Sequence, residues 1–275
     1  MNASTLTRGS RVGKHKASPA MEGAARAGFT ARGVIYLLVG LLALQIAFGG
    51  SGKQADQGGA LQEVAGKPFG AVVLWTLGVG LVGMALWRLS ETAFGAAGPD
   101  GHKAKKRGAS AARAVFYGFV AYSVLSFAAG SGGSGSSDGK SRDATARAMD
   151  LPAGRWLVGV AGVVILCAGV WMVVQAARRK FHKHMRLGEM SRPVRRTVDV
   201  TGAGGGVARG LVFAVAGGFA VRAAVDYEPD KAKGMDDTLR SLAETPAGPW
   251  LLVFIAVGLM LFGVFSFAMA RYRKL

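Results

Sequence analysis

The chain has 275 residues, of which 51% are hydrophobic and only 18% are charged, with a formal net charge of +18. Charged residues make up about 25% of an average soluble domain, and the mean hydropathy here is +0.30. This composition excludes an ordinary soluble enzyme and also a disordered chain, which requires low hydrophobicity. The single cysteine, Cys167, excludes an internal disulfide and zinc sites built from several cysteines.

Six apolar runs follow one another along the chain, each near the roughly 20 residues that cross the hydrocarbon of a bilayer. We expect membrane-spanning helices over 30–48, 70–90, 111–130, 154–177, 207–225 and 248–270. The few charges of these runs are arginines near their ends, where long side chains can reach the lipid headgroups: Arg32, Arg88, Arg113, Arg155, Arg209 and Arg222. The sequence therefore predicts an all-α polytopic membrane protein.

The basic residues alternate between the two sides of this predicted bundle. The N-terminal tail, the two connections after even-numbered runs and the C-terminus hold 24 of the 34 lysines and arginines, and the remaining connections hold 10. Acidic residues show the opposite bias, so the two sides carry net charges of +19 and −1. Because basic loops stay in the cytoplasm, both termini are predicted to be cytoplasmic.

Each odd-numbered run opens with the same pattern of an arginine, a small residue, two aliphatic or aromatic residues and a ring. The three copies are Arg32–Tyr36, Arg113–Tyr117 and Arg209–Phe213. Every even-numbered run follows a Pro-x-Gly sequence, in which the proline is expected in the first turn of the helix. The prolines are Pro68, Pro152 and Pro246, and an aromatic ring follows each at the same distance: Trp87, Trp171 and Phe265.

These matches indicate an internal repeat whose unit is a two-helix hairpin. Three hairpins of equal orientation predict approximate three-fold pseudosymmetry about the membrane normal. Short segments before two of the prolines, 60–65 and 239–243, are expected to form small helices at the outer interface. Small residues recur every four positions at Gly206, Gly210, Ala214 and Gly218, and on one face of the third run at Ser110, Ala114, Gly118 and Ser126, and we expect both stripes to pack against neighbouring helices.

The openings and the Pro-x-Gly segments resemble the domain of unknown function 1206 family of bacterial membrane proteins, which carry tandem copies of a two-span unit. The resemblance implies repeats over 25–95, 108–180 and 202–275, a basic tail over 1–24 that we expect to be disordered, and a basic cytoplasmic linker over 181–201. It also implies a location in the bacterial plasma membrane. The family supplies no reaction.

No residue pattern points to a catalytic, cofactor or metal site. The glycine-rich run 201–206 lacks the preceding strand of a nucleotide-binding turn. His182 and His184 lie in a basic stretch where solvated side chains are the simpler interpretation, and the acidic loop 226–237 does not have calcium-loop spacing. We expect anionic lipid headgroups at the cytoplasmic face as partners, possible contacts with other membrane proteins and no nucleic acid, since Phe181 alone interrupts the basic segments.

Two functions remain open on this evidence. The first is a non-enzymatic accessory or scaffolding subunit that packs against other membrane proteins through its small-residue faces. The second is a channel, carrier or lipid-handling protein with a site on the pseudo-three-fold axis, which a polar cavity there would favour. Each opening arginine is expected either to meet the ring of its own repeat, as in Arg32 with Trp87, or to reach lipid phosphate.

Overall fold

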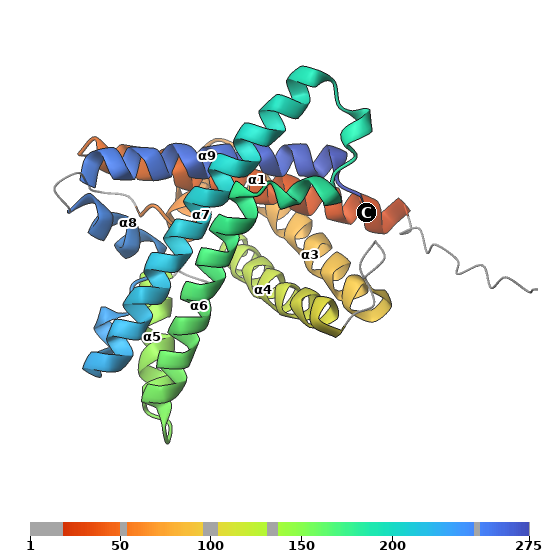
Figure 1. Ribbon diagram of the computed structural model, residues 1–275. Coiled ribbons are helices and arrows are strands. Elements are labelled where there is room, and N and C mark those ends of the chain that lie inside the picture. The colour runs from red at the N-terminus through yellow and green to blue at the C-terminus, as the bar shows by residue number, and fades with distance from the viewer. Residues whose placement is uncertain (1–18, 50–53, 96–103, 131–136, 245–247, 275) are drawn as a thin grey trace, which may run out of the picture.

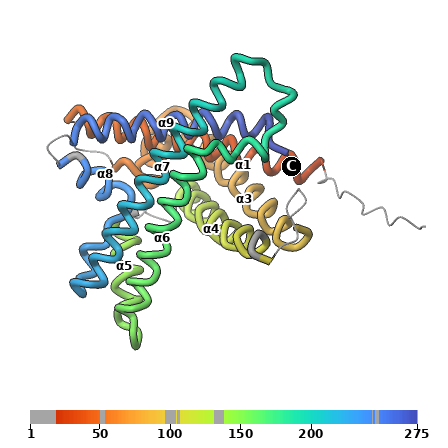
Figure 2. The backbone as a smooth tube through the Cα atoms, in the orientation of Figure 1, coloured from red at the N-terminus to blue at the C-terminus, as the bar shows by residue number. Residues whose placement is uncertain are grey.

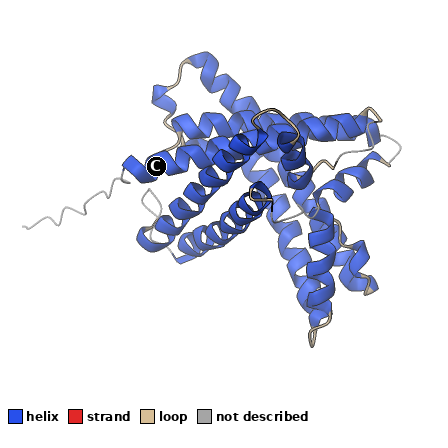
Figure 3. Cartoon of the chain, turned by 180° about the vertical axis from the view of Figure 1, so that it is seen from behind, coloured by secondary structure: helices blue, strands red, loops and turns tan. Residues whose placement is uncertain are grey.

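The computed structural model describes residues 19–49, 54–95, 104–130, 137–244 and 248–274. Within these ranges the chain is helical and has no strand, as Figure 3 shows. Six long helices are α1 (Pro19–Ala47), α3 (Gly70–Phe94), α4 (Ala104–Ala128), α6 (Gly154–Ala177), α7 (Arg192–Asp226) and α9 (Gly248–Tyr272). Each contains a stretch long and apolar enough to cross a membrane. The predicted all-α class with six long apolar helices is confirmed.

Three shorter α-helices connect the long ones at one end of the bundle, here called the capped end. They are α2 (Gln57–Ala65), α5 (Ser137–Met149) and α8 (Met235–Ala243). The helices α2 and α8 fall where small helices were expected. Short 3-10 helices η1 (Lys180–His184) and η2 (Leu187–Glu189) lie at the opposite, basic end, and η3 (Pro229–Lys231) precedes α8.

The Pro-x-Gly sequences form tight turns rather than helix starts. Pro68 lies in a turn, Phe69 has a left-handed φ of 62°, and α3 begins at Gly70; Ala153, with φ 60°, repeats this arrangement before Gly154. A side chain on Gly70 or Gly154 would collide with the last turn of the preceding short helix. Glycine is therefore required at the third position, and the proline lies before the helix instead of in its first turn. Pro246 lies outside the described residues.

Helices pair most closely between repeats rather than within them. Figures 1 and 2 show α1 beside α9, α3 beside α4, and α6 beside α7. Within repeats, α1 packs on α3 and α7 packs on α9, whereas the two long helices of the middle repeat, α4 and α6, do not pack closely on each other. The bundle is therefore a ring of helices that is open between α4 and α6.

Small residues mediate the α6–α7 pair as expected, but only in part. Gly206 and Gly210 face Ala176 and Val173 of α6, and Gly169 of α6 packs against the backbone of Ala214. In the stripe of the third run, Ser110 is buried and its hydroxyl donates to Glu91 of α3 at 3.2 Å. In contrast, a side chain on Gly218 or Gly118 would meet nothing within 4 Å. The predicted packing of these two glycines is wrong, because no described neighbour lies within contact distance of either position.

Two boundaries extend beyond the expected spans. The helix α7 begins at Arg192, with Pro193 in its first turn, so the part of the expected linker from 192 to 201 belongs to this helix. The helix α1 begins at Pro19, so the last part of the expected disordered tail is helical, and residues 1–18 lie outside the described chain. As a result Arg209 is the central residue of the 35-residue α7, not the first residue of a span.

Candidate functional site: a cavity inside the bundle

A cavity of about 570 Å3 lies inside the ring, with walls from α1, α4, α6 and α7 and its far end under the short helices. Apolar side chains make up most of the wall. Residues of α2, α5 and the segment 232–235 close the capped end, including Gln57, Ser141, Thr145 and Met235. Ligand sites in proteins have volumes of about 300–1,000 Å3 and mostly apolar walls with few polar groups. This cavity has both properties.

The repeated openings of the odd-numbered helices line this cavity. The positions three and four residues after each arginine all contribute: Ile35 and Tyr36 from α1, Phe116 and Tyr117 from α4, and Val212 and Phe213 from α7. Arg32 and Arg209 also line the wall, whereas Arg113 does not and is exposed. Residues spaced by three and four positions share one face of a helix. The repeat motif thus places one face of each odd-numbered helix on the same cavity.

Arg32 is buried, with 9% of its surface exposed, and is held by groups from three helices. Its Nε donates to Ser266 Oγ of α9 at 3.1 Å, and its Nη1 donates to the hydroxyl of Tyr117 of α4 at 3.4 Å. Its Cζ lies 4.9 Å from the ring centroid of Phe29 and 5.1 Å from that of Phe262. Arg32 therefore faces the protein interior instead of the lipid.

Arg209 lies among three aromatic rings. Its Cζ is 5.0 Å from the centroid of Phe262, 5.3 Å from Phe213 and 5.7 Å from Tyr36. Its Nε is buried and has no hydrogen-bond partner in the described part of the chain. Phe262 of α9 thus lies against both guanidinium groups, and one nitrogen of Arg209 is left unsatisfied beside the cavity.

The rings expected to meet these arginines lie elsewhere. Trp87 is buried and faces Arg88 and Arg273, at 4.2 and 4.9 Å from the Cζ atoms. Phe265 is buried against Phe181, with 5.0 Å between ring centroids. Trp171 is 60% exposed on the outer face of α6, with Lys180 Nζ 5.5 Å from its ring. Arg32 and Arg209 thus lie against Phe262 of α9 instead of against Trp87 and Phe265.

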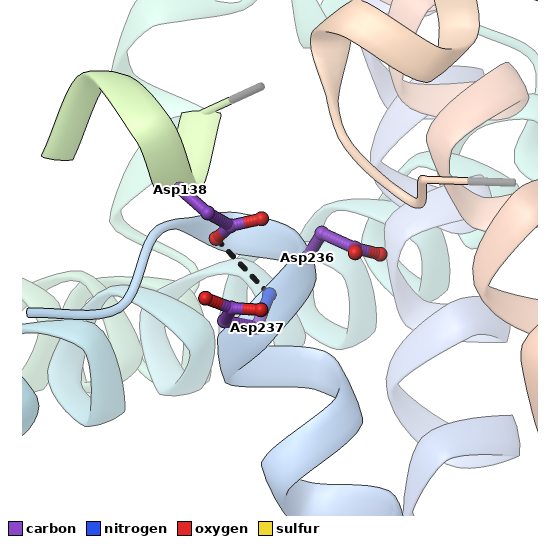
Figure 4. A group of neighbouring side chains, drawn as sticks. All are labelled: Asp138, Asp236 and Asp237. Atoms are coloured by element: carbon purple, nitrogen blue, oxygen red, sulfur yellow. Dashed lines mark hydrogen bonds between the residues drawn. The ribbon is translucent and has the colours of Figure 1, made fainter. Parts of the chain in front are cut away.

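A network of three aspartates joins the short helices at the capped end (Figure 4). Asp138 of α5 accepts a hydrogen bond from the backbone N–H of Asp237 at 3.1 Å, and Asp237 pairs with Arg142. Asp236 accepts the N–H of Ala55 at 2.7 Å and pairs with Arg240. Each carboxylate has a partner in the protein, so the cluster links the three outer connections above the cavity.

Burial, together with the negative charges of Asp237, Asp236 and Asp56, raises the pKa of the Asp138 carboxyl to about 6, against the lowering effect of the hydrogen bond from the Asp237 N–H. The ionised form of Asp138 is therefore disfavoured in the folded protein.

A second hollow, of about 610 Å3, lies along the first turns of α7 at the basic end. Its lining comes from α7 alone and includes Arg192 and Arg196. One helix shapes this hollow, so it is a basic surface rather than an enclosed site.

The six long apolar helices define a multi-pass membrane protein, and its helix bundle contains a cavity. The chain belongs to the family described as Domain of Unknown Function (DUF1206), which it matches over residues 27–95, 108–179 and 204–273. The resemblance drawn from the repeated motifs is thereby confirmed. The chain is also similar to the uncharacterized protein YxxB of Bacillus subtilis (strain 168), with 28% identity over 267 residues, which cover 95% of this chain and 94% of that protein. No solved structure matches the chain.

Proposed function

We propose that this protein is a lipid-handling membrane protein that holds an amphiphile in the cavity between α1, α4, α6 and α7. The observation that carries the proposal is the convergence of the repeat motif on that cavity. Of the nine side chains at the arginine position and at the third and fourth positions after it, all but Arg113 line the wall. A motif that served only helix packing would not need to leave a cavity at the place where its copies meet.

The open side of the ring supplies a route from the bilayer. The helices α4 and α6 both contribute to the cavity wall, yet they do not pack closely on each other. Their cavity-lining residues Phe116 and Leu157 are 53% and 56% exposed. An amphiphile dissolved in the membrane can therefore enter sideways, with no need to cross water.

We propose binding rather than catalysis as the role of this cavity. Among the described residues, its lining has no carboxylate, histidine or cysteine to act as general base or nucleophile. The charged residues of the wall are Arg32, Arg209 and Lys233, all basic. Such a wall suits the recognition of a polar head and an apolar chain.

The orientation that we propose has both termini in the cytoplasm of a bacterium and the short helices on the outer side of the plasma membrane. Support comes from the charge difference of +19 against −1 between the two sides of the bundle. In this orientation Arg192 and Arg196 at the start of α7 contact anionic headgroups of the cytoplasmic leaflet.

A second candidate function is that of an accessory subunit that packs against other membrane proteins. The outward faces of α4 and α6 favour it, because large apolar side chains are mostly exposed there. Phe119, Tyr122, Trp156 and Val160 are between 59% and 75% exposed. Lipid covers such faces equally well, so the cavity is the more specific observation.

Native mass spectrometry of the protein released from mild detergent tests the proposed function. Wild-type protein is expected to retain one lipid-like molecule per chain. Ala216→Trp fills the cavity from α7 and should abolish retention, whereas Val170→Trp, at an exposed position of α6 that does not line the cavity, should leave it unchanged. Equal retention by the two variants would refute a ligand in the cavity.

A further inference from the structure

We infer that the cavity binds a single-chain amphiphile with an anionic head, a carboxylate or a phosphate, and that Arg209 and Arg32 hold this head. The inference rests on the proposed function and adds the chemical class of the ligand. Three observations carry it: the charge of the wall, the surroundings of the two arginines and the shape of the apolar part.

The positive charges of the cavity wall are not balanced by carboxylates among its described residues. Arg32 and Arg209 both line the wall, and neither forms an ion pair with a carboxylate in the described part of the chain. Arg88, in contrast, pairs with Glu91 at 2.7 Å, and Arg222 pairs with Asp226 at 3.5 Å. A charged side chain within a membrane span is costly and is usually paired. The two cavity arginines therefore lack the counter-anion that Arg88 and Arg222 have.

Arg209 lies at the middle of α7 and has a buried N–H donor without a described partner, and both features suit the binding of an anion inside the bundle. As the central residue of α7, it lies about 15 Å beyond Asp199 and about 20 Å before Arg222, at about 1.5 Å per residue. The rings of Tyr36, Phe213 and Phe262 hold its guanidinium group, but its buried Nε has no partner. A guanidinium group can present two parallel N–H donors to a carboxylate or phosphate.

Two tyrosines contact the cavity arginines, Tyr36 with its ring 5.7 Å from Arg209 Cζ and Tyr117 with its hydroxyl 3.4 Å from Arg32 Nη1. Tyr36 and Tyr117 both line the cavity, and the Tyr117 hydroxyl already accepts a hydrogen bond from Arg32. That hydroxyl can donate its own proton to an anion while it accepts from Arg32. An anionic head next to Arg209 thus meets two guanidinium groups and two phenols.

The apolar part of the cavity wall fits one hydrocarbon chain. From Arg209 to Ala220 the lining follows α7 for about 16 Å, with Val212, Phe213 and Ala216 between them. Val158 and Ile165 of the neighbouring helix α6 continue this apolar lining. The volume of about 570 Å3 accommodates one hydrocarbon chain with its head, so a second chain would have to remain in the bilayer.

Equilibrium binding of radiolabelled palmitate, hexadecyl phosphate and hexadecanol to the full chain in nanodiscs tests the inference. The three probes share one chain and differ only in the head. We expect palmitate or hexadecyl phosphate to bind at least about tenfold more tightly than hexadecanol, because charge-assisted hydrogen bonds are the stronger ones. The better of the two acids identifies the head as a carboxylate or a phosphate.

Substitution of Arg209 provides the second part of this binding experiment. In Arg209→Gln the affinity for the acid should fall to that for hexadecanol, while the affinity for hexadecanol stays unchanged. Arg222→Gln removes an exposed charge from the same helix and should change neither affinity. Since Arg209→Gln might fail to fold, the comparison of acid with alcohol on the wild-type protein decides the question by itself. Equal binding of all three probes would overturn the anionic head and leave the proposed function standing, whereas no saturable binding of any probe would overturn both.

Discussion

Arg32 and Ser266 connect the first and last long helices of the bundle, with 3.1 Å between Arg32 Nε and Ser266 Oγ. Ser266 is fully buried, and its hydroxyl donates in turn to the carbonyl oxygen of Phe262 at 2.9 Å. The same turn of α9 therefore orients the guanidinium group through Ser266 and supplies the ring of Phe262 on which it lies. One cavity arginine is thus positioned by a helix from another repeat.

Ser266→Ala should destabilise the protein, because it leaves the Arg32 Nε buried without an acceptor. An unsatisfied buried donor costs about 1–3 kcal/mol. Ser90→Ala is the matched control, since the Ser90 hydroxyl donates only to Trp87 within its own helix. Thermal unfolding in detergent should show a lower Tm for Ser266→Ala alone, and equal Tm values for the two variants would mean that the Arg32 contact contributes nothing.

Gly169→Ala should weaken the α6–α7 pair, because the added methyl group would collide with the backbone of Ala214. Overpacking of this kind costs about 1–3 kcal/mol. Gly118→Ala adds the same methyl group on α4, where nothing lies within 4 Å, and should raise stability by up to about 1 kcal/mol through helix propensity. Unfolding temperatures that move in the same direction for both variants would contradict the close α6–α7 contact.

Protonation of Asp138, which links two of the short helices, should make the folded protein more stable as the pH falls. The pKa of Asp138 in the folded protein is about 6, above the ordinary 3.8, so the folded state binds this proton more tightly than the unfolded chain does. Stability should therefore rise as the pH is lowered through about 6. Asp138→Asn retains an acceptor for the Asp237 N–H but cannot titrate.

Unfolding temperatures measured at about pH 7 and about pH 5 test this expectation. The rise in Tm on acidification should be smaller in Asp138→Asn than in Asp143→Asn, an exposed site on the same helix. An identical rise in both variants would show that Asp138 does not carry the pH dependence.

The proposed orientation predicts which side of the membrane each connection faces. Single cysteines at Ser51, Ser136 and Lys233, placed in a Cys167→Ala background, should react with an impermeant maleimide added outside intact cells. Ser51 and Ser136 lie outside the described residues, and Lys233 lies at the capped end. If any one of them reacts only after the cells are opened, that connection lies on the cytoplasmic side, and the proposed orientation is contradicted there.

Sequence patterns predicted most of the architecture because it depends on local properties. Run length and hydropathy determine the six long helices, and the repeated Pro-x-Gly marks the turns at Phe69 and Ala153. The contacts of the arginines depend on which helices become neighbours. Counting residues along the two helices predicted that Trp87 lies at the same depth in the membrane as Arg32. The count does not predict the direction in which each side chain points around its helix axis, and this direction decides whether the two side chains meet.

The cavity was less accessible to prediction, although one signal for it was present. Arginine and the residues three and four positions later repeat on one helical face in all three copies, which indicated a shared surface. Nothing in the sequence showed that Phe262 of the third repeat would lie against both Arg32 and Arg209. The open side between α4 and α6 likewise arises from the pairing of helices between repeats.

Photo-crosslinking with a diazirine-bearing palmitate, followed by peptide mass spectrometry, tests the location of the ligand most directly. Label is predicted on Val158 and Val212, which line the cavity and are 5% and 3% exposed, and excess palmitate should compete it away. Label confined to lipid-facing residues such as Val164 and Val170, 60% and 49% exposed, and insensitive to competition, would contradict a binding site inside the bundle.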